Sequence, residues 1–187
     1  MAAVLKAAVF ALAIIAAEKR FTMADGAKEY NIKKFLTKNS VLLNMRTTHG
    51  TFNPCQWYQV ENLGDSDVTV SAWIYIDNTK RTASGGHAKK WKFEGTDKMW
   101  SGDEGPDDDR DEKRLLYQDD DVTCGVLQYD EIYDSIGIEK RTYYELLVNK
   151  DHIRSVPNGC TDYYSKITEN KKISENKEED LKTCKFE

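Results

Sequence analysis

The sequence predicts a mainly β protein, an eight-stranded antiparallel barrel with a short N-terminal helix and a C-terminal helix. Three observations support this fold class. About eight short runs have strand-like composition and are separated by closely spaced turn signals. Apolar residues alternate with a period of two in the clearest of these runs. The chain of 187 residues suits a single domain, and closing its sheet into a barrel removes unpaired edge strands.

The N-terminus has the layout of a secretory signal peptide over residues 1–17. Lys6 supplies a positive charge, Ala7–Ala17 is an unbroken run of 11 apolar or small residues, and charged residues follow from Glu18. A run of this length is too short to span a membrane, and no later stretch of the sequence is long enough. We therefore expect a secreted, extracellular protein with no membrane span. The alternative is a buried N-terminal helix, which the high alanine content allows.

The folded domain is expected over residues 31–187, because residues 18–30 are polar and unpatterned and read as a flexible lead-in. Asn31–Lys38 is predicted to form two helical turns, with Ile32, Phe35 and Leu36 on one face. After this helix the period of the pattern changes to two, which marks the start of the predicted barrel strands.

The clearest predicted strand is Val68–Ile76. Val70 and Ala72 share one of its faces, and Trp73 and Tyr75 share the other. The remaining predicted strands are Val41–Thr48, Cys55–Val60, Lys90–Phe93, Met99–Trp100, Leu115–Gln118, Thr123–Tyr129 and Thr142–Val148. A barrel of eight strands is wide enough to hold one small ligand.

Three segments lie outside the strands. Gly102–Lys113 is strongly acidic and is predicted to be a solvated loop at the barrel mouth. Pro157–Thr168 is predicted to be a helix, and Lys171–Lys182 a charged surface segment anchored by Cys184. The helix after the last strand and the late cysteines disfavour the alternative fold, an immunoglobulin-like sandwich.

Composition and motifs exclude several classes of function. The 32 acidic residues exceed the 27 Lys and Arg, giving a net charge of −5, which argues against a nucleic-acid-binding protein. The acidic run Asp107–Glu112 lacks the ligand spacing of a calcium loop. The sequence has no hydrolase, metalloprotease or phosphate-loop motif, so we expect no catalysis, no cofactor and no metal. His49, His87 and His152 have no motif partners and are predicted to lie on the surface.

The cysteines predict disulfides. Secretion and an even count of four favour bridges, and the sequence has no C-x-x-C pair of the kind that binds zinc. The four residues are Cys55, Cys124, Cys160 and Cys184, and three connectivities are possible.

Three short segments carry a resemblance to a known family. They are Thr123–Leu127 (TCGVL), Tyr143–Leu147 (YYELL) and Pro157–Cys160 (PNGC). Their arrangement resembles the tick salivary lipocalins of the histamine-binding family, in which a Cys-Asp-aliphatic triplet precedes Glu-Leu-aromatic and then a cysteine at a helix. The NIKKFL stretch and the final cysteine near the terminus also match, so the resemblance extends over Asn31–Glu187.

The resemblance implies an eight-stranded lipocalin (calycin) barrel that sequesters a small mediator of host inflammation and so aids evasion of host defence. It also implies that Cys124 pairs with Cys160 and Cys55 with Cys184. The partner is then a small molecule, either a biogenic amine or a lipid mediator. A different class of function, in which the barrel surface binds a host immune or clotting protein, stays open.

For an amine ligand, Glu145 is the best candidate residue. Histamine and serotonin are cations at neutral pH, so their site needs a carboxylate and aromatic faces. The family motif places its glutamate in the cavity at this position, and Tyr143 and Leu147 share the strand face of Glu145. A buried carboxylate needs a partner, which a ligand ammonium can provide. The alternative is that Glu145 pairs with Arg141 or faces water.

Two departures from the family pattern favour a larger, more apolar ligand. Gly125 stands where the family has aspartate, and Leu147 where it has an aromatic residue. If Gly125 faces the cavity, Leu127 and Tyr129 follow it there by strand parity, and the pocket gains room for a fatty acid or eicosanoid. The sequence offers Arg46, Lys90 and Lys92 as cations for such a carboxylate but places none of them inside.

The aromatic residues of the central strands divide ambiguously. Trp73, Tyr75, Trp91 and Phe93 can face either the cavity or the outside of the barrel, where a helix can cover them. We expect packing in the core or under a helix for these side chains, since that is the commoner fate of such residues.

Overall fold

The computed structural model describes residues 28–38, 41–76, 79–82, 88–102, 109–133 and 139–186. The predicted signal peptide, most of the predicted lead-in, His87 and residues 103–108 of the acidic loop lie outside these ranges. Within the described ranges, no helix has the length and apolarity needed to cross a membrane.

Strands make up most of the described chain. They are β1 (Val41–Thr47), β2 (Trp57–Leu63), β3 (Asp67–Ile76), β4 (Thr79–Thr82), β5 (Lys89–Glu94), β6 (Lys98–Gly102), β7 (Arg110–Gln118), β8 (Cys124–Tyr133), β9 (Glu139–Asn149) and β10 (Ser174–Glu175). The helices are α1 (Ile32–Lys38), the 3-10 helix η1 (Lys150–His152), α2 (Asn158–Ile167) and α3 (Glu178–Leu181).

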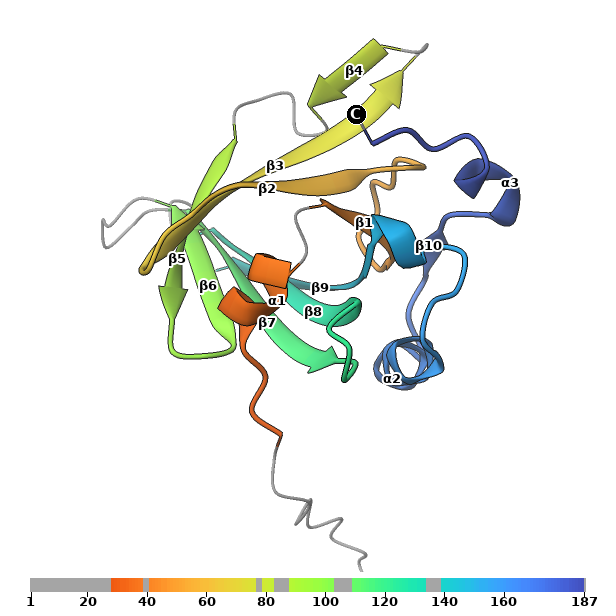
Figure 1. The fold of residues 1–187 in the computed structure, drawn as a ribbon. Helices are drawn as coiled ribbons and strands as arrows, with labels where there is room; N and C mark the ends of the chain where they lie inside the picture. Colours follow the sequence, from red (N-terminus) through yellow and green to blue (C-terminus); the bar gives the residue numbers. More distant parts are fainter. Residues whose placement is uncertain are drawn as a thin grey trace, which may run out of the picture.

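Eight of the described strands close into an antiparallel barrel, as the sequence predicts (Figure 1). They follow the order β1-β2-β3-β5-β6-β7-β8-β9, and β9 pairs back with β1. The other two strands extend the sheet. Strand β4 pairs with the C-terminal end of β3, and β10 pairs with the C-terminal end of β1, beyond the residues of β1 that pair with β2. Closure pairs the first and last barrel strands, so neither is left as an open edge.

Helix α1 packs against the barrel interior through the predicted face. Ile32, Phe35 and Leu36 are buried in an inner cluster that includes Leu115 and Leu127. The helix starts after Asn31, whose side chain accepts a hydrogen bond from the Lys34 amide at 2.8 Å. The inner cluster is therefore closed by a helix at one end of the barrel.

A second cluster lies outside the barrel, between the sheet and α2. Helix α2 contacts β8 and β9 and buries Cys160 and Tyr164 (Figure 1). Trp57 is fully buried in this outer cluster, and Trp73 packs against it. Trp73 thus packs against a core cluster, which is one of the two outcomes expected for it.

Two segments differ from the sequence prediction. The end of the acidic segment, Arg110–Lys113, belongs to β7 rather than to a solvated loop. Its inward positions carry charged side chains, which hides the strand alternation. The charged segment Lys171–Lys182 contains β10 and α3, and Asn176 within it is buried.

Candidate functional site

The barrel contains a cavity of about 290 Å³. Its apolar base is formed by residues that also belong to the inner cluster, among them Leu36, Leu42, Met99, Leu127 and Leu147. Among the described residues, four Phe, Tyr or Trp side chains line it, namely Phe52, Tyr58, Trp91 and Tyr129. Its charged or amide side chains include Asn44, Lys89, Asp111, Lys113, Glu131 and Glu145. Trp91 is therefore an aromatic side chain that faces the cavity as well as the core.

The six predicted ligand-binding residues lie on one face of β8 and β9. Cross-strand register pairs Gly125 with Leu147, Leu127 with Glu145, and Tyr129 with Tyr143. This register agrees with the predicted strand parity of both segments. The four residues of this set that line the cavity are Leu127, Tyr129, Glu145 and Leu147.

The other two predicted residues lie at opposite ends of this face. Gly125 does not widen the cavity as expected, because the ring of Phe35 and the side chain of Leu115 fill the space in front of it. A β-carbon on Gly125 would lie 2.9 Å from Phe35 Cζ. Tyr143 lies toward the outer end of the cavity, where its ring packs 4.4 Å from that of His49.

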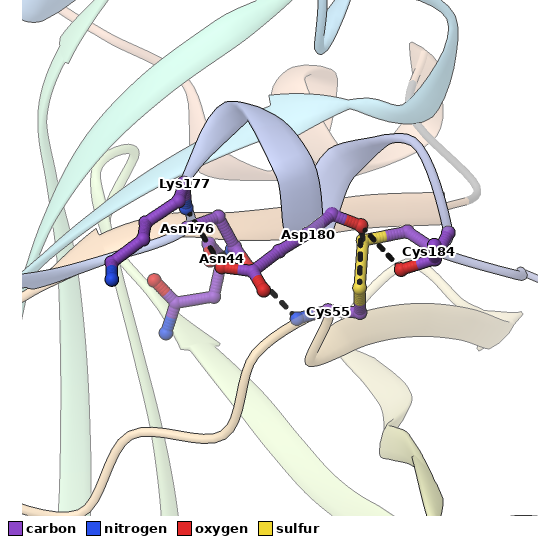
Figure 2. Close-up of a disulfide and its surroundings, with 7 residues drawn as sticks. Asn44, Cys55, Asn176, Lys177, Asp180 and Cys184 are labelled. Carbon is purple, nitrogen blue, oxygen red and sulfur yellow. Dashed lines mark hydrogen bonds between the residues drawn. A yellow bond between two sulfur atoms is a disulfide. The ribbon is translucent and has the colours of Figure 1, made fainter.

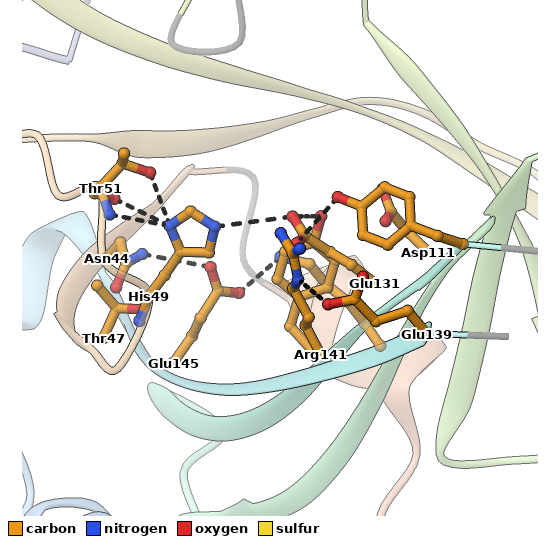
Figure 3. Close-up of polar contacts among 12 residues, drawn as sticks. Asn44, Thr47, His49, Thr51, Asp111, Glu131, Glu139, Arg141 and Glu145 are labelled. Carbon is orange, nitrogen blue, oxygen red and sulfur yellow. Dashed lines mark hydrogen bonds and ion pairs between the residues drawn. The ribbon is translucent and has the colours of Figure 1, made fainter. Parts of the chain in front are cut away.

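Glu145 is buried and its carboxylate is already paired. Lys113 Nζ donates to its Oε2 at 2.6 Å, and the Tyr58 hydroxyl donates to its Oε1 at 2.7 Å. Asn44 Nδ2 donates to Oε1 at 3.3 Å. The partner is therefore Lys113 and not Arg141, which pairs with Glu139 at 2.8 Å in an exposed position (Figure 3). Sequence analysis does not identify Lys113, because the residue lies in the predicted acidic loop. Its position two residues before Leu115, and thus on the same strand face, is the signal that could have identified it.

The ammonium of Lys113 lies among three aromatic rings. Its Nζ is 4.4 Å from the ring centroid of Tyr58, 4.9 Å from that of Tyr129 and 5.7 Å from that of Trp91. We call these three rings and the carboxylate of Glu145 the ammonium cage. Burial and the neighbouring Glu145 raise the pKa of Tyr58 well above its ordinary value, so its hydroxyl stays protonated and remains a donor.

Asn44 adds an unused acceptor beside the ammonium cage. The residue is only 3% exposed and lines the cavity. Its Oδ1 has no hydrogen-bond partner among the described residues. A buried amide oxygen of this kind can accept a hydrogen bond from a ligand N–H group.

The outer end of the cavity is built around Glu131. His49 Nε2 lies 3.6 Å from its Oε1 (Figure 3), and the hydroxyls of Tyr129 and Tyr133 donate to its carboxylate at 3.3 Å each. A second hollow of about 280 Å³ shares Glu131 and Tyr129 with the cavity. Burial and the neighbouring Glu131 raise the pKa of Tyr129, which keeps its hydroxyl protonated. The sequence analysis missed Glu131, and His49 was expected on the surface.

Two lysines line the cavity among the residues that the structure describes. Lys113 is the first, and Lys89, which pairs with Asp111, is the second. Burial, and then the charge of Lys113, lower the pKa of Lys89.

The three cations that the sequence offered for a carboxylate ligand do not line the cavity. Arg46 pairs with Glu175 at 2.9 Å, and Lys90 pairs with Asp67 at 3.2 Å. Lys92 lies over the ring of Trp100.

The disulfides have the pairing that the resemblance implies. Cys124–Cys160 joins β8 to α2, and Cys55–Cys184 joins the loop before β2 to the C-terminal segment. Asn176 reinforces the second link, because it accepts from the Cys55 amide and donates to the Asn44 carbonyl, both at 2.8 Å (Figure 2). The loop fixed in this way spans residues 48–56 and is called the mouth loop below; several of its residues line the cavity, His49 among them.

A three-residue group near the first disulfide does not form a metal site. Asp119, Cys124 and Cys160 lie close together, but both sulfurs are in the disulfide. The Asp119 carboxylate accepts hydrogen bonds from the Thr123 and Cys124 amides at 2.7 and 2.8 Å. These contacts fix the turn before β8.

Comparison with known proteins identifies the fold. No protein-family model matches the sequence, and no curated protein matches it. A crystal structure of the protein AM182 in complex with serotonin is similar over 79% of this chain and 90% of that one, with 15% identity and a TM-score of 0.57. The siderocalin Ex-FABP, described as having dual ligand specificities, is similar over 74% of this chain and 88% of that one, with 12% identity and a TM-score of 0.50. The chain therefore has the lipocalin fold.

Proposed function

We propose that this protein is a secreted lipocalin that sequesters a small biogenic amine, histamine or serotonin, in its barrel cavity. The resemblance to the tick histamine-binding lipocalins gives this activity a role in saliva, where removal of the amine aids evasion of host defence. The fold neighbour AM182 was crystallised with serotonin, so a barrel of this fold can hold such a ligand.

One observation carries the proposal: the cavity combines aromatic rings with an excess of negative charge. Among the described residues, three carboxylates, those of Asp111, Glu131 and Glu145, line it together with two lysines. One further positive charge therefore balances the cavity when His49 is neutral. Aromatic rings beside an unbalanced carboxylate attract a cation that also carries an aromatic ring.

The ammonium of the ligand is assigned to Glu131 rather than to Glu145. Glu145 has Lys113 as its cation, whereas Glu131 has the His49 ring and two tyrosine hydroxyls. The ring of the ligand then extends inward over Tyr129 toward the apolar base at Leu127 and Leu147. In this arrangement Tyr143 borders the ammonium, and Glu145 acts by holding Lys113.

The size of the cavity also supports a small ligand. Its volume of about 290 Å³ is at the lower end of the range of about 300–1,000 Å³ that is usual for small-molecule sites. An imidazole or indole ring with an ethylammonium chain suits this size better than a long acyl chain does.

Calorimetric titration of the disulfide-intact protein with histamine and serotonin at neutral pH tests the proposal. Glu131→Gln should weaken binding by about tenfold or more, because a desolvated charge pair contributes at least about 1.4 kcal/mol. Glu139→Gln is the matched control, since it removes an exposed carboxylate that does not line the cavity. No heat with either amine, or equal affinity in Glu131→Gln, would contradict the proposal.

A second candidate, a fatty acid or eicosanoid scavenger, is favoured by Lys89. Burial, and then the charge of Lys113 in the same cavity, lower the pKa of Lys89, and a ligand carboxylate would favour its charged form. Displacement of a fluorescent fatty acid tests this candidate. Lys89→Gln should abolish displacement, whereas Lys90→Gln should not, because Lys90 is exposed and pairs with Asp67.

A further inference from the structure

We propose that the ammonium cage is an alkylammonium-binding site that the protein fills with its own Lys113. Lys113 is then the residue that closes the inner end of the cavity to free amines. The inference goes beyond the proposed function, because it depends on the contacts of Lys113 and not on which ligand the outer end takes.

The contacts of Lys113 are those by which proteins recognise a free alkylammonium ion. A carboxylate oxygen accepts from its Nζ at 2.6 Å, and ring centroids of Tyr58 and Tyr129 lie within 5 Å. Trp91 adds a third ring. A carboxylate together with several aromatic faces is the usual environment of a bound organic cation. Here the same environment surrounds the end of a side chain.

Burial sets this ion pair apart from the others in the described residues. The side chains of Lys113 and Glu145 are 7% and 5% exposed, whereas the side chain of Lys98, which pairs with Glu94 and Glu112, is 15% exposed and those of the remaining paired lysines are more exposed still. Burying both charges costs several kcal/mol per ion, and an apolar pair of similar volume often serves folding as well. Packing alone therefore does not account for a lysine at this position. A lysine that keeps free cationic ligands out of the inner end of the cavity does account for it.

Lys113 reaches the ammonium cage through its own methylene chain. The carbons from Cγ to Cε and the Nζ together have the composition of n-propylammonium. Replacing Lys113 by alanine removes this group and leaves Glu145 with its Tyr58 and Asn44 donors. The Asn44 Oδ1 beside the carboxylate is a second acceptor for the N–H groups of an incoming ammonium.

Binding of n-propylammonium to Lys113→Ala tests the inference. The probe should raise the thermal unfolding midpoint of the disulfide-intact variant in a saturable way, since a ligand that binds the folded state stabilises it. Its affinity for the variant should exceed that for the unmodified protein by about tenfold or more, because desolvated cation–π contacts alone contribute about that much. 1-Propanol, which has the same length but no charge, should have no comparable effect.

Two further variants give matched controls. Lys113→Met fills the space without a charge and should not bind the probe. Lys113→Ala combined with Glu145→Gln keeps the space but removes the carboxylate, and should lose the binding. If Lys113→Ala does not fold alone, its refolding yield with n-propylammonium replaces the thermal midpoint, and a gain that propanol does not reproduce supports the inference.

Three outcomes would overturn the inference. They are equal binding of propanol and n-propylammonium by Lys113→Ala, equal binding of n-propylammonium by the unmodified protein, and binding that survives the loss of the Glu145 carboxylate. None of them depends on histamine or serotonin. The inference can therefore fail while Glu131 still binds an amine, and it can hold while the amine proposal fails.

Discussion

The inner and outer ends of the cavity balance their carboxylates in different ways. At the inner end, Glu145 meets the permanent charge of Lys113 at 2.6 Å. At the outer end, Glu131 lies 3.6 Å from His49, which is charged only when protonated. The inner carboxylate thus has a permanent cation within the protein, whereas the outer one is where we propose that a ligand cation binds. A carboxylate in a cavity therefore indicates a ligand site only after its partners have been identified.

Breaking the inner pair should lower stability strongly. Glu145→Gln leaves the Lys113 ammonium buried without a countercharge, and should lower the free energy of unfolding by about 3–5 kcal/mol. Glu131→Gln should lower it by less than about 1 kcal/mol, because the outer pair is partly solvated. Urea denaturation with the disulfides intact measures both. Equal losses would remove the distinction between the two ends.

Removing the Cys55–Cys184 disulfide, which holds the mouth loop, should lower stability strongly. It should also weaken ligand binding at the outer end of the cavity. In the chain-entropy account, which is disputed, a bridge across 129 residues contributes about 5 kcal/mol and one across 36 residues about 4 kcal/mol. Replacing Cys55 and Cys184 by serine should also weaken amine binding, because His49 lies in the mouth loop. Replacing Cys124 and Cys160 by serine should lower stability but leave the affinity of the folded protein unchanged. Denaturation and calorimetry on both variants separate the two effects.

A methyl group at Gly125 should produce a moderate loss of stability without a change in binding. Its β-carbon would lie 2.9 Å from Phe35 Cζ and 3.0 Å from Leu115 Cδ1, and overpacking of this kind costs about 1–3 kcal/mol. Gly50→Ala is the matched control, since its β-carbon meets nothing within 4 Å. A strong change of ligand affinity in Gly125→Ala would contradict the finding that Phe35 and Leu115 separate Gly125 from the cavity.

A weak dependence of stability on pH is expected through Lys89. Burial and the charge of Lys113 lower the pKa of Lys89 below its ordinary value of 10.5. Between these two pKa values the unfolded chain binds more protons at this residue, so its contribution to stability rises with pH. Denaturation series across this alkaline window should therefore differ in slope between the unmodified protein and Lys89→Gln. Parallel series would show that Lys89 is not perturbed.

The sequence predicts the framework of the site better than its charges. Alternation places Leu127 and Tyr129 on one strand face and Tyr143 and Glu145 on the next, and the register of β8 and β9 brings these pairs together. Such parity is local information, so it can be obtained from one segment at a time.

Lys113 could not be obtained in this way. A lysine in an acidic run has the composition of a solvated loop, and its burial depends on a carboxylate 32 residues further along the chain. The tyrosine and tryptophan rings around it come from still other strands. The same limit applies to Asn176, whose partners Asn44 and Cys55 are more than 120 residues away in the sequence.

The covalent attachment of Lys113 has a consequence for competition inside the barrel. A group held on a short chain meets its partner at an effective concentration in the millimolar range or above, roughly independent of dilution. A free amine at micromolar concentration in the surrounding fluid is outnumbered at the ammonium cage by this single attached group. If the two proposals hold, the inner end is insensitive to ambient amines, and the barrel responds to amine concentration at its outer end alone.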